Sequence, residues 1–170
     1  RNKRSNEASM KYFLLGAFSS GVILYGMSLL YGLSGSTNLY DIASRVAGLQ
    51  NSTLLMLSLF MMMAGLCFKI AAVPFHMWVP DAYEGAPASI TAFMSVAVKA
   101  AAFAIFIRIF FVAFSDLREV YTLVLALIAM ITITWGNVAA ITQQNIKRLL
   151  AYSSISHAGF VLMGIVAGTQ

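Results

Sequence analysis

Two lysines inside long apolar runs constrain this chain more than any other feature of its sequence. Lys69 lies near the end of an apolar run that Pro74 interrupts, and Lys99 lies inside the next run. A lysine at the centre of a membrane-spanning helix costs roughly 2.5–3.5 kcal/mol on insertion scales. We therefore expect these two side chains to be functional.

The composition and the lengths of the apolar runs place the chain in a membrane. Of its 170 residues, 60% are hydrophobic and 10% are charged, whereas a soluble domain carries about 25% charged residues. A spanning helix needs about 20 residues, and five runs are long enough: 11–33, 53–74, 88–114, 120–142 and 147–168. The predicted fold is all-α, a polytopic transmembrane helix bundle over 1–170, with a Pro-broken helix that continues over 75–85.

Several function classes are excluded by missing motifs. Cys67 is the single cysteine, which excludes an internal disulfide and a cysteine-based metal or cluster site. The net charge of +5 comes from basic residues at helix ends without interleaved aromatics, which indicates membrane topology and no nucleic-acid partner. The chain shows no GxGxxG after a strand, no P-loop, no CxxC and no histidine pair at haem-ligand spacing, so we expect no cofactor in it. It opens on Arg1 without a signal-peptide pattern, and we expect an internal segment of a longer protein.

The basic residues are divided unequally between the two sides of the membrane. The loops place two on one side, Arg45 and Arg118, and six on the other: Arg1, Lys3, Arg4, Lys11, Lys147 and Arg148. The positive-inside rule predicts that the second set is cytoplasmic. The segment 75–87 falls on this side but is acidic, with Asp81 and Glu84, which suggests that it has another role.

Two prolines predict that the second spanning helix is discontinuous. Pro74 cannot donate a hydrogen bond to the carbonyl of Ile70, and Pro80 cannot donate one to that of His76. Non-helical backbone at membrane depth is tolerated only where protein or a watery cavity surrounds it, and discontinuous helices mark ion sites in transporters. Alternatively, Pro74 ends the helix at the surface, but the apolar character of 75–83 favours the broken helix.

Lys99 is predicted to lie near the middle of the membrane and to face the bundle interior. It follows Pro87 by twelve residues, about 18 Å of helix, in a hydrocarbon core about 30 Å thick. It shares a helix stripe with small or polar residues, namely Ala88, Ala92, Ser95 and Ala102.

Other polar and small residues allow two interpretations each. Lys11, at the start of the first span, extends to the interface by default. The pairs Gly16–Ser20 and Ser28–Gly32 predict close helix packing. His157 shares a face with Ser153 and is either an ordinary buried side chain or a member of a proton relay.

A buried lysine suits proton transfer, because burial disfavours the charged amine and lets it release its proton as the surroundings change. Lysines joined by water and by Ser, Thr and His side chains would form a proton path.

Two long motifs resemble one membrane-protein family. The run FKIAAVPFHMWVPDAYEGAP at 68–87 and the run NIKRLLAYSSISH at 145–157 are similar to signatures of the antiporter-like subunits of respiratory complex I, NADH:quinone oxidoreductase. The segment Glu7–Phe13, and a lysine instead of a histidine at position 99, favour one branch of this family. The resemblance covers nearly the whole chain, and it implies transmembrane helices six to ten of about fourteen.

The resemblance implies roles for single residues. Lys69 would be the lysine of the discontinuous seventh helix, Lys99 the connecting lysine of the eighth and Lys11 the lysine of the sixth. The family's fifth-helix glutamate would precede Arg1, and Glu7, expected in a loop, would not replace it. The family's twelfth-helix charged residue would follow the last residue of this chain.

The resemblance also implies a function. The chain would belong to a non-redox, proton-translocating subunit that couples quinone reduction elsewhere to proton transfer through its lysines. NADH, FMN, iron–sulfur clusters and quinone would be bound by other subunits. Its partners would be other membrane subunits of complex I and the lipid bilayer, in a bacterial inner membrane or an equivalent energy-transducing membrane.

Three alternatives stay open at this point. The chain could belong to a Mrp-type Na⁺/H⁺ antiporter subunit or to a membrane subunit of a related hydrogenase complex. It could also be a passive scaffold whose lysines only hold helices together. A quinone site within the chain is a weaker alternative, because no motif requires one.

Overall fold

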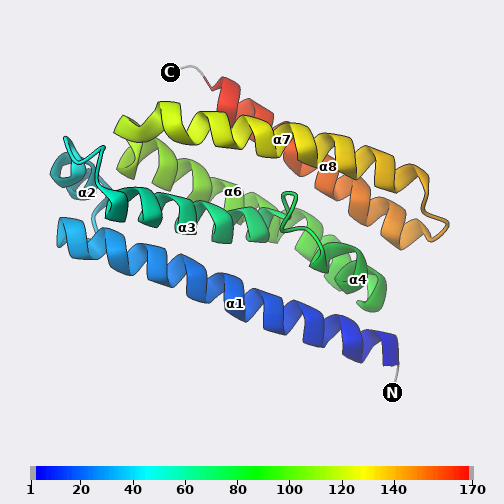
Figure 1. Ribbon diagram of the computed structural model, residues 1–170. Coiled ribbons are helices and arrows are strands. Elements are labelled where there is room, and N and C mark those ends of the chain that lie inside the picture. The colour runs from blue at the N-terminus through cyan, green and yellow to red at the C-terminus, as the bar shows by residue number, and fades with distance from the viewer. Residues whose placement is uncertain (1–2, 169–170) are drawn as a thin grey trace.

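The computed structural model describes residues 3–168, which fold into a bundle of helices (Figure 1). Five helices are long and apolar enough to cross a membrane: Ser5–Ser34, Thr53–Ile70, Ala88–Ala113, Ser115–Ile141 and Ile146–Ala167. Each overlaps one of the five predicted runs. The predicted all-α, multi-pass membrane fold is confirmed.

The elements follow one another along the chain without strands in the described part. They are α1 Lys3–Ser34, α2 Leu39–Val46, α3 Thr53–Ile70, α4 Trp78–Gly85, α5 Ala88–Phe93, the π-helical turn η1 Met94–Val98, α6 Lys99–Arg108, the π-helical turn η2 Ile109–Ala113, the 3₁₀ turn η3 Ser115–Leu117, α7 Arg118–Ile141 and α8 Ile146–Ala167. α5, η1, α6 and η2 together form the third span.

α1 is longer than the predicted run 11–33, so Glu7 lies in this helix and not in a loop. α1 packs along α3 (Figure 1). Two glycines lie in close contact between these helices. A Cβ atom at Gly26 would lie 2.7 Å from Met62 Cγ, and one at Gly65 would lie 2.1 Å from Ile23 Cγ1. These contacts leave no room for a side chain.

The small-residue pairs predicted from sequence lie only partly at this contact. A Cβ atom added at Gly16 or at Gly32 would meet no described atom within 4 Å. Spacing along one helix identifies small residues, but the neighbouring helix decides which of them it approaches. The close packing predicted from Gly16–Ser20 and Ser28–Gly32 is therefore not seen at these two glycines, and elsewhere it stays a prediction.

α7 and α8 form an antiparallel hairpin with backbone contact. Asn145 caps α8, because its side chain accepts a hydrogen bond of 2.9 Å from the Lys147 N–H. A Cβ atom at Gly136 would lie 2.8 Å from Ser156 N, and one at Gly159 would lie 2.6 Å from Ile133 Cγ1. The two glycines thus let the helices touch.

The core lies where α3, α6, α7 and α8 meet. Phe106 and Phe110 are fully buried and stack with 4.4 Å between ring centroids. Leu59 of α3, Leu125 of α7 and Leu162 of α8 pack into the same cluster. This core holds the helices that carry the candidate site in fixed positions.

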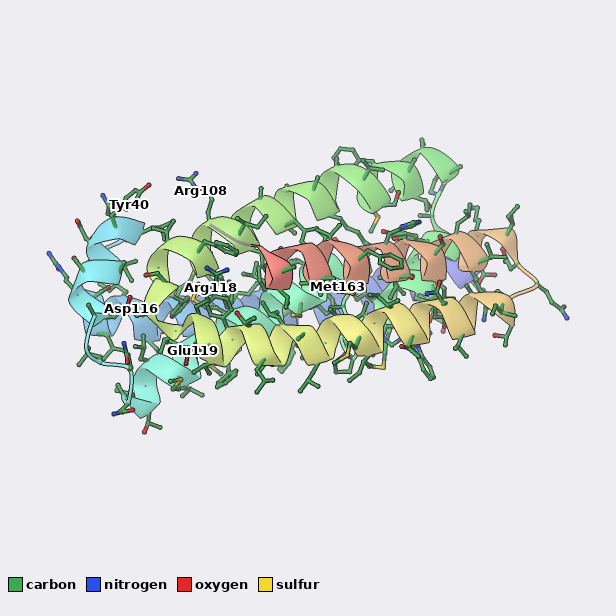
Figure 2. All side chains as sticks on the ribbon, turned by 90° about the horizontal axis from the view of Figure 1, so that it is seen from above. Tyr40, Arg108, Asp116, Arg118, Glu119 and Met163 are labelled. Carbon is green, nitrogen blue, oxygen red and sulfur yellow. The ribbon has the colours of Figure 1, made fainter. Side chains whose placement is uncertain are left out.

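Basic and acidic side chains gather at both ends of the bundle. Tyr40, Arg108, Asp116, Arg118 and Glu119 gather at the end where α2 lies (Figure 2). The other end holds Lys11, Lys147 and Arg148 together with both carboxylates of 75–87. Arg1 lies outside the described residues, and so does the side chain of Arg4. The orientation from the positive-inside rule stays a prediction.

Candidate functional site

The second spanning helix is broken inside the protein. α3 ends at Ile70, Ala71 takes a left-handed conformation with φ 64°, and α4 begins at Trp78. Ala71 and Ala72 are fully buried. This burial excludes the alternative in which the helix ends at the surface, and it confirms the predicted discontinuous helix.

Side chains of α4 and α7 form hydrogen bonds with backbone groups at the break. The indole N–H of Trp78 donates to the Phe68 carbonyl at 3.2 Å, which caps the end of α3. The Val73 N–H donates to Thr132 Oγ1 of α7 at 3.0 Å. Without such partners, buried backbone groups would destabilise the break. The break is therefore a built part of the fold.

The two prolines have different positions in this break. Pro74 lies within it, between α3 and α4. Pro80 lies in the first turn of α4, where a backbone N–H would have no helical partner. The His76 carbonyl, which we expected to be free, accepts a hydrogen bond from the Val79 N–H at 3.0 Å. The prediction for Pro80 is corrected: it starts a helix and does not break one.

Lys69 lies in the last turn of α3 and is half-buried. Its Nζ donates a hydrogen bond of 3.3 Å to Ser20 Oγ of α1. The Ser20 hydroxyl in turn donates to the Gly16 carbonyl at 2.8 Å. Lys69 makes no ion pair with any side chain that the structure describes. Its amine is thus held between α1 and the break by a neutral oxygen.

Lys99 is the first residue of α6 and is 6% exposed. It directly follows the π-helical turn η1, and such wide turns are frequent at functional sites. Its Nζ donates to two oxygens of Ser154 on α8, to the carbonyl at 2.9 Å and to Oγ at 2.5 Å. Lys99 faces the interior, as its helix stripe predicts, and no described carboxylate pairs with it.

Lys11 belongs to a cluster of charges at one end of the bundle. Its Nζ lies 2.8 Å from Glu7 Oε1 and 2.8 Å from Asp81 Oδ2. Arg148 Nη1 lies 2.9 Å from Asp81 Oδ1 and 3.0 Å from Glu84 Oε2. These pairs line a half-open hollow of about 300 Å³. They connect α1, α4 and α8, which explains the acidic residues on an otherwise basic side.

His157 forms no contact with Lys69 or Lys99 among the hydrogen bonds of the described residues. Its side chain is exposed on α8, and its ring centroid lies 6.3 Å from that of Phe160. Ser154, three residues earlier, takes the place beside Lys99. The relay role of His157 stays a prediction that the described residues do not support with a contact.

Four side chains of the site were missed from sequence. Ser20 and Ser154 are the oxygens that bind the lysines, and Tyr83 and His76 are titratable groups of the broken helix. His76 faces Trp135 of α7 with 6.2 Å between ring centroids. His76 and Tyr83 lie inside the run 68–87, so the motif itself was a signal for them. Ser154 lies inside the run 145–157 and Ser20 in the pair Gly16–Ser20, but the sequence does not show which serine meets which lysine, because only the neighbouring helix selects them.

The charged cluster predicts that the contact between α4 and α1 becomes less stable at low pH. Burial raises the pKa of Asp81, but hydrogen bonds from Lys11 and Arg148 outweigh it and hold this pKa below its ordinary value of 3.8. A lowered carboxyl pKa contributes stability above the ordinary value, and this contribution is lost as the pH falls through the folded-state pKa. Asp81→Asn is therefore expected to lower the free energy of unfolding by about 1 kcal/mol or less at pH 7.

The measurement is the thermal midpoint of the full-length subunit in lipid nanodiscs, from pH 7 down to pH 3. The difference between the native protein and Asp81→Asn should shrink once the pH falls below the ordinary carboxyl value. Asp116→Asn, at the other end of the bundle, is the matched control and should show no such trend. An Asp81→Asn difference of constant size down to pH 3 would contradict the role given to this carboxylate.

The fold and the site define a polytopic membrane protein with a discontinuous helix and a buried lysine on the next helix. The transmembrane family described as NADH:quinone oxidoreductase/Mrp antiporter matches residues 1–170. The chain belongs to this family. Among the described residues, no group of three or more His, Cys, Asp or Glu side chains could hold a metal ion, and the predicted lack of a cofactor stays a prediction.

The relatives agree with the branch that the opening segment and Lys99 favour, which is subunit N. The chain is 58% identical over 171 residues to NADH-quinone oxidoreductase subunit N 1 of Koribacter versatilis, covering 98% of this chain and 34% of that protein. It thus spans about a third of the length of the curated relatives it matches.

Solved structures contain the same fold. A chain of respiratory complex I from Thermus thermophilus is 39% identical with a TM-score of 0.80, covering 97% of this chain and 35% of that one. A chain of the Mrp complex from Dietzia is 24% identical with a TM-score of 0.90, covering 99% and 31%. The second likeness shows the fold alone.

Proposed function

We propose that this chain is part of a proton-translocating membrane subunit of NADH:quinone oxidoreductase, with Lys99 as a central proton carrier. The observation that carries the proposal is the surroundings of Lys99: a buried amine on a membrane-spanning helix, bound by two neutral oxygens of Ser154. A carboxylate partner would fix the amine in its charged form. A serine hydroxyl can accept a hydrogen bond from the ammonium or donate one to the neutral amine.

Lys69, Lys11 and His157 complete the proposed path. Lys69 lies at the broken helix beside Ser20, where movement of the break would change its surroundings. Lys11 lies in the charged hollow at one end, and its amine would carry a proton only after it separates from Glu7 and Asp81. His157 would act through parts of the protein that face α8 from outside this chain. The named relative from Koribacter versatilis supports this assignment, because it is a subunit of the quinone oxidoreductase.

The proposal gives the subunit no redox step of its own. NADH, FMN, iron–sulfur clusters and quinone would be bound by other subunits of the complex, in a bacterial inner membrane or an equivalent energy-transducing membrane. Electron transfer there would supply the energy, and this chain would supply sites at which protons bind, move and leave. The partners would be neighbouring membrane subunits of complex I.

The alternative function is that of a Mrp-type Na⁺/H⁺ antiporter subunit, which the shared fold of the Mrp complex keeps open. The assembled complex in sealed membrane vesicles separates the two. NADH-driven acidification that is independent of Na⁺ supports proton translocation by a quinone oxidoreductase. A pH gradient that forms only on exchange with Na⁺, without NADH oxidation, supports the antiporter.

Lys69→Ala tests the path at the broken helix. Because this removes the amine beside Ser20, we expect proton translocation per electron to fall about tenfold or more, with assembly retained. The measurement is vesicle acidification divided by the rate of NADH oxidation. Lys3→Ala, an exposed lysine on α1, is the control and should keep the native ratio. A native ratio in Lys69→Ala would remove Lys69 from the path.

A further inference from the structure

A buried tyrosine of the broken helix has no role in the path described so far. Tyr83 of α4 is 1% exposed, and its ring lies 6.2 Å from that of Trp78 at 79°. Its carbonyl accepts a hydrogen bond from Thr91 Oγ1 at 3.1 Å, which ties it to α5. Its hydroxyl is buried, yet it forms no hydrogen bond of good geometry with any described residue. Such orphaned groups are rare and require an explanation.

Ser154 lies between this hydroxyl and Lys99. Tyr83 packs into one cluster with Ala151 and Ile155 of α8, on either side of Ser154 in sequence. Ser154 follows Ala151 by three positions and therefore lies on the same side of α8. Its hydroxyl accepts the 2.5 Å hydrogen bond from Lys99 Nζ. This serine therefore holds Lys99 and lies on the side of α8 against which Tyr83 packs.

The hydrogen bonds through this serine depend on the charge of the lysine. When Lys99 is an ammonium, it donates to Ser154 Oγ, and the serine hydrogen is free to turn towards Tyr83. Tyr83 can then donate only to the same serine oxygen, where it competes with the ammonium. When Lys99 is neutral, its lone pair accepts the serine hydrogen, and Tyr83 donates to Ser154 Oγ. In this second arrangement the tyrosine, the serine and the amine form one chain of hydrogen bonds, in which each bond strengthens the next.

We propose that Tyr83 is a positioning residue for Lys99, whose hydroxyl acts through Ser154 to favour the neutral amine over the ammonium. The inference deepens the proposed function and rests on it. Because Tyr83 lies on α4 and Lys99 on α6, a shift of the second half of the broken helix against α8 changes the proton equilibrium of the lysine. The break would thus regulate the carrier.

The other charged and titratable groups nearby leave this arrangement intact. The phenol of Tyr83 keeps its hydrogen under physiological conditions, because burial disfavours the charged phenolate. From α1, the ring of Tyr12 lies 5.0 Å from that of Trp78, which in turn packs against Tyr83. On α4, Glu84 is paired with Arg148, and on α8, His157 is exposed.

The test is the pH dependence of NADH-driven proton translocation by the assembled complex in vesicles. Tyr83→Phe keeps the buried ring and removes the hydroxyl that favours the neutral amine. We expect the alkaline limb of the pH profile to move to higher pH by about half a unit or more, a threefold change in the protonation equilibrium. Tyr121→Phe, another buried tyrosine, is the control and should keep the native profile.

Two further variants show whether the hydroxyl acts through Ser154. In a Ser154→Ala background, Tyr83→Phe should produce no additional shift, because the connection is already lost. In a Ser154→Thr background, which keeps a hydroxyl, the shift should return. An unchanged profile in Tyr83→Phe, or an equal shift in the Ser154→Ala background, would overturn the inference.

Lys99→Ala distinguishes failure of this inference from failure of the proposed function. If Lys99→Ala keeps native translocation, the proposed function fails and the inference fails with it. If Lys99→Ala loses translocation while Tyr83→Phe keeps the native pH profile, the inference alone fails.

Discussion

Lys99→Met is expected to lower proton translocation by about a hundredfold while the subunit still folds and inserts. Methionine has nearly the length of lysine and fills the same space in the core. It also removes the cost of an amine at membrane depth, roughly 2.5–3.5 kcal/mol on insertion scales, so the fold should not suffer. The loss would come from the missing proton acceptor beside Ser154. The measurement is vesicle acidification per NADH oxidised, with subunit abundance determined in the same membranes.

Lys99→Arg separates a proton carrier from a scaffold. Arginine keeps a positive charge and several donors, but it does not release its proton in proteins. A lysine that only holds α6 to α8 could be replaced by arginine with little loss of transport. A lysine that carries protons could not, so both Lys99→Met and Lys99→Arg should fail. Lys3→Met at the exposed end of α1 controls for the loss of a lysine as such. Native translocation in Lys99→Arg would contradict the carrier role.

Features that depend on one segment of the chain could be predicted from sequence. The five spans follow from the length and hydropathy of single runs. The break follows from Pro74, whose ring and missing N–H disrupt any helix. The inward direction of Lys99 follows from the small residues on its own helix stripe, and its 6% exposure agrees. In each case the physical cause lies within about twenty neighbouring residues.

Features that depend on two segments could not be predicted in this way. Lys11 and Asp81 are separated by 70 residues, and Lys99 and Ser154 by 55. Several serines on α8 could have faced Lys99 at helical spacing, and only the packing of α6 against α8 selects Ser154. The same holds for the glycines of α1, where α3 approaches Gly26 and leaves Gly16 open.

The α7–α8 hairpin supports both parts of the site. Thr132 on α7 accepts the hydrogen bond from the Val73 N–H and so holds the break. Ser154 on α8 holds Lys99. The separation of these two helices therefore fixes the break and the buried lysine relative to each other. Gly136 sets this separation, since its α-carbon faces the backbone of Ser156.

Gly136→Ala is therefore expected to damage stability and transport together. Its new Cβ atom would lie 2.8 Å from Ser156 N and 3.0 Å from Ser156 Cα, and backbone atoms cannot move aside as a flexible side chain can. Overpacking of this kind lowers the stability of the fold by about 1–3 kcal/mol. The better helix propensity of alanine offsets at most about 1 kcal/mol of this loss. Forcing α7 from α8 would also lengthen the Val73–Thr132 hydrogen bond and shift Ser154 against Lys99.

Gly164→Ala on α8 is the matched control, because a Cβ atom there meets no described atom within 4 Å. It should leave the thermal midpoint unchanged or raise it, through helix propensity alone. The measurement is the thermal midpoint of the full-length subunit in nanodiscs, followed by proton translocation per electron in the assembled complex. If Gly136→Ala matched Gly164→Ala in both thermal midpoint and proton translocation, the α7–α8 contact would tolerate a larger side chain. The hairpin could then not be the element that fixes the break relative to Lys99.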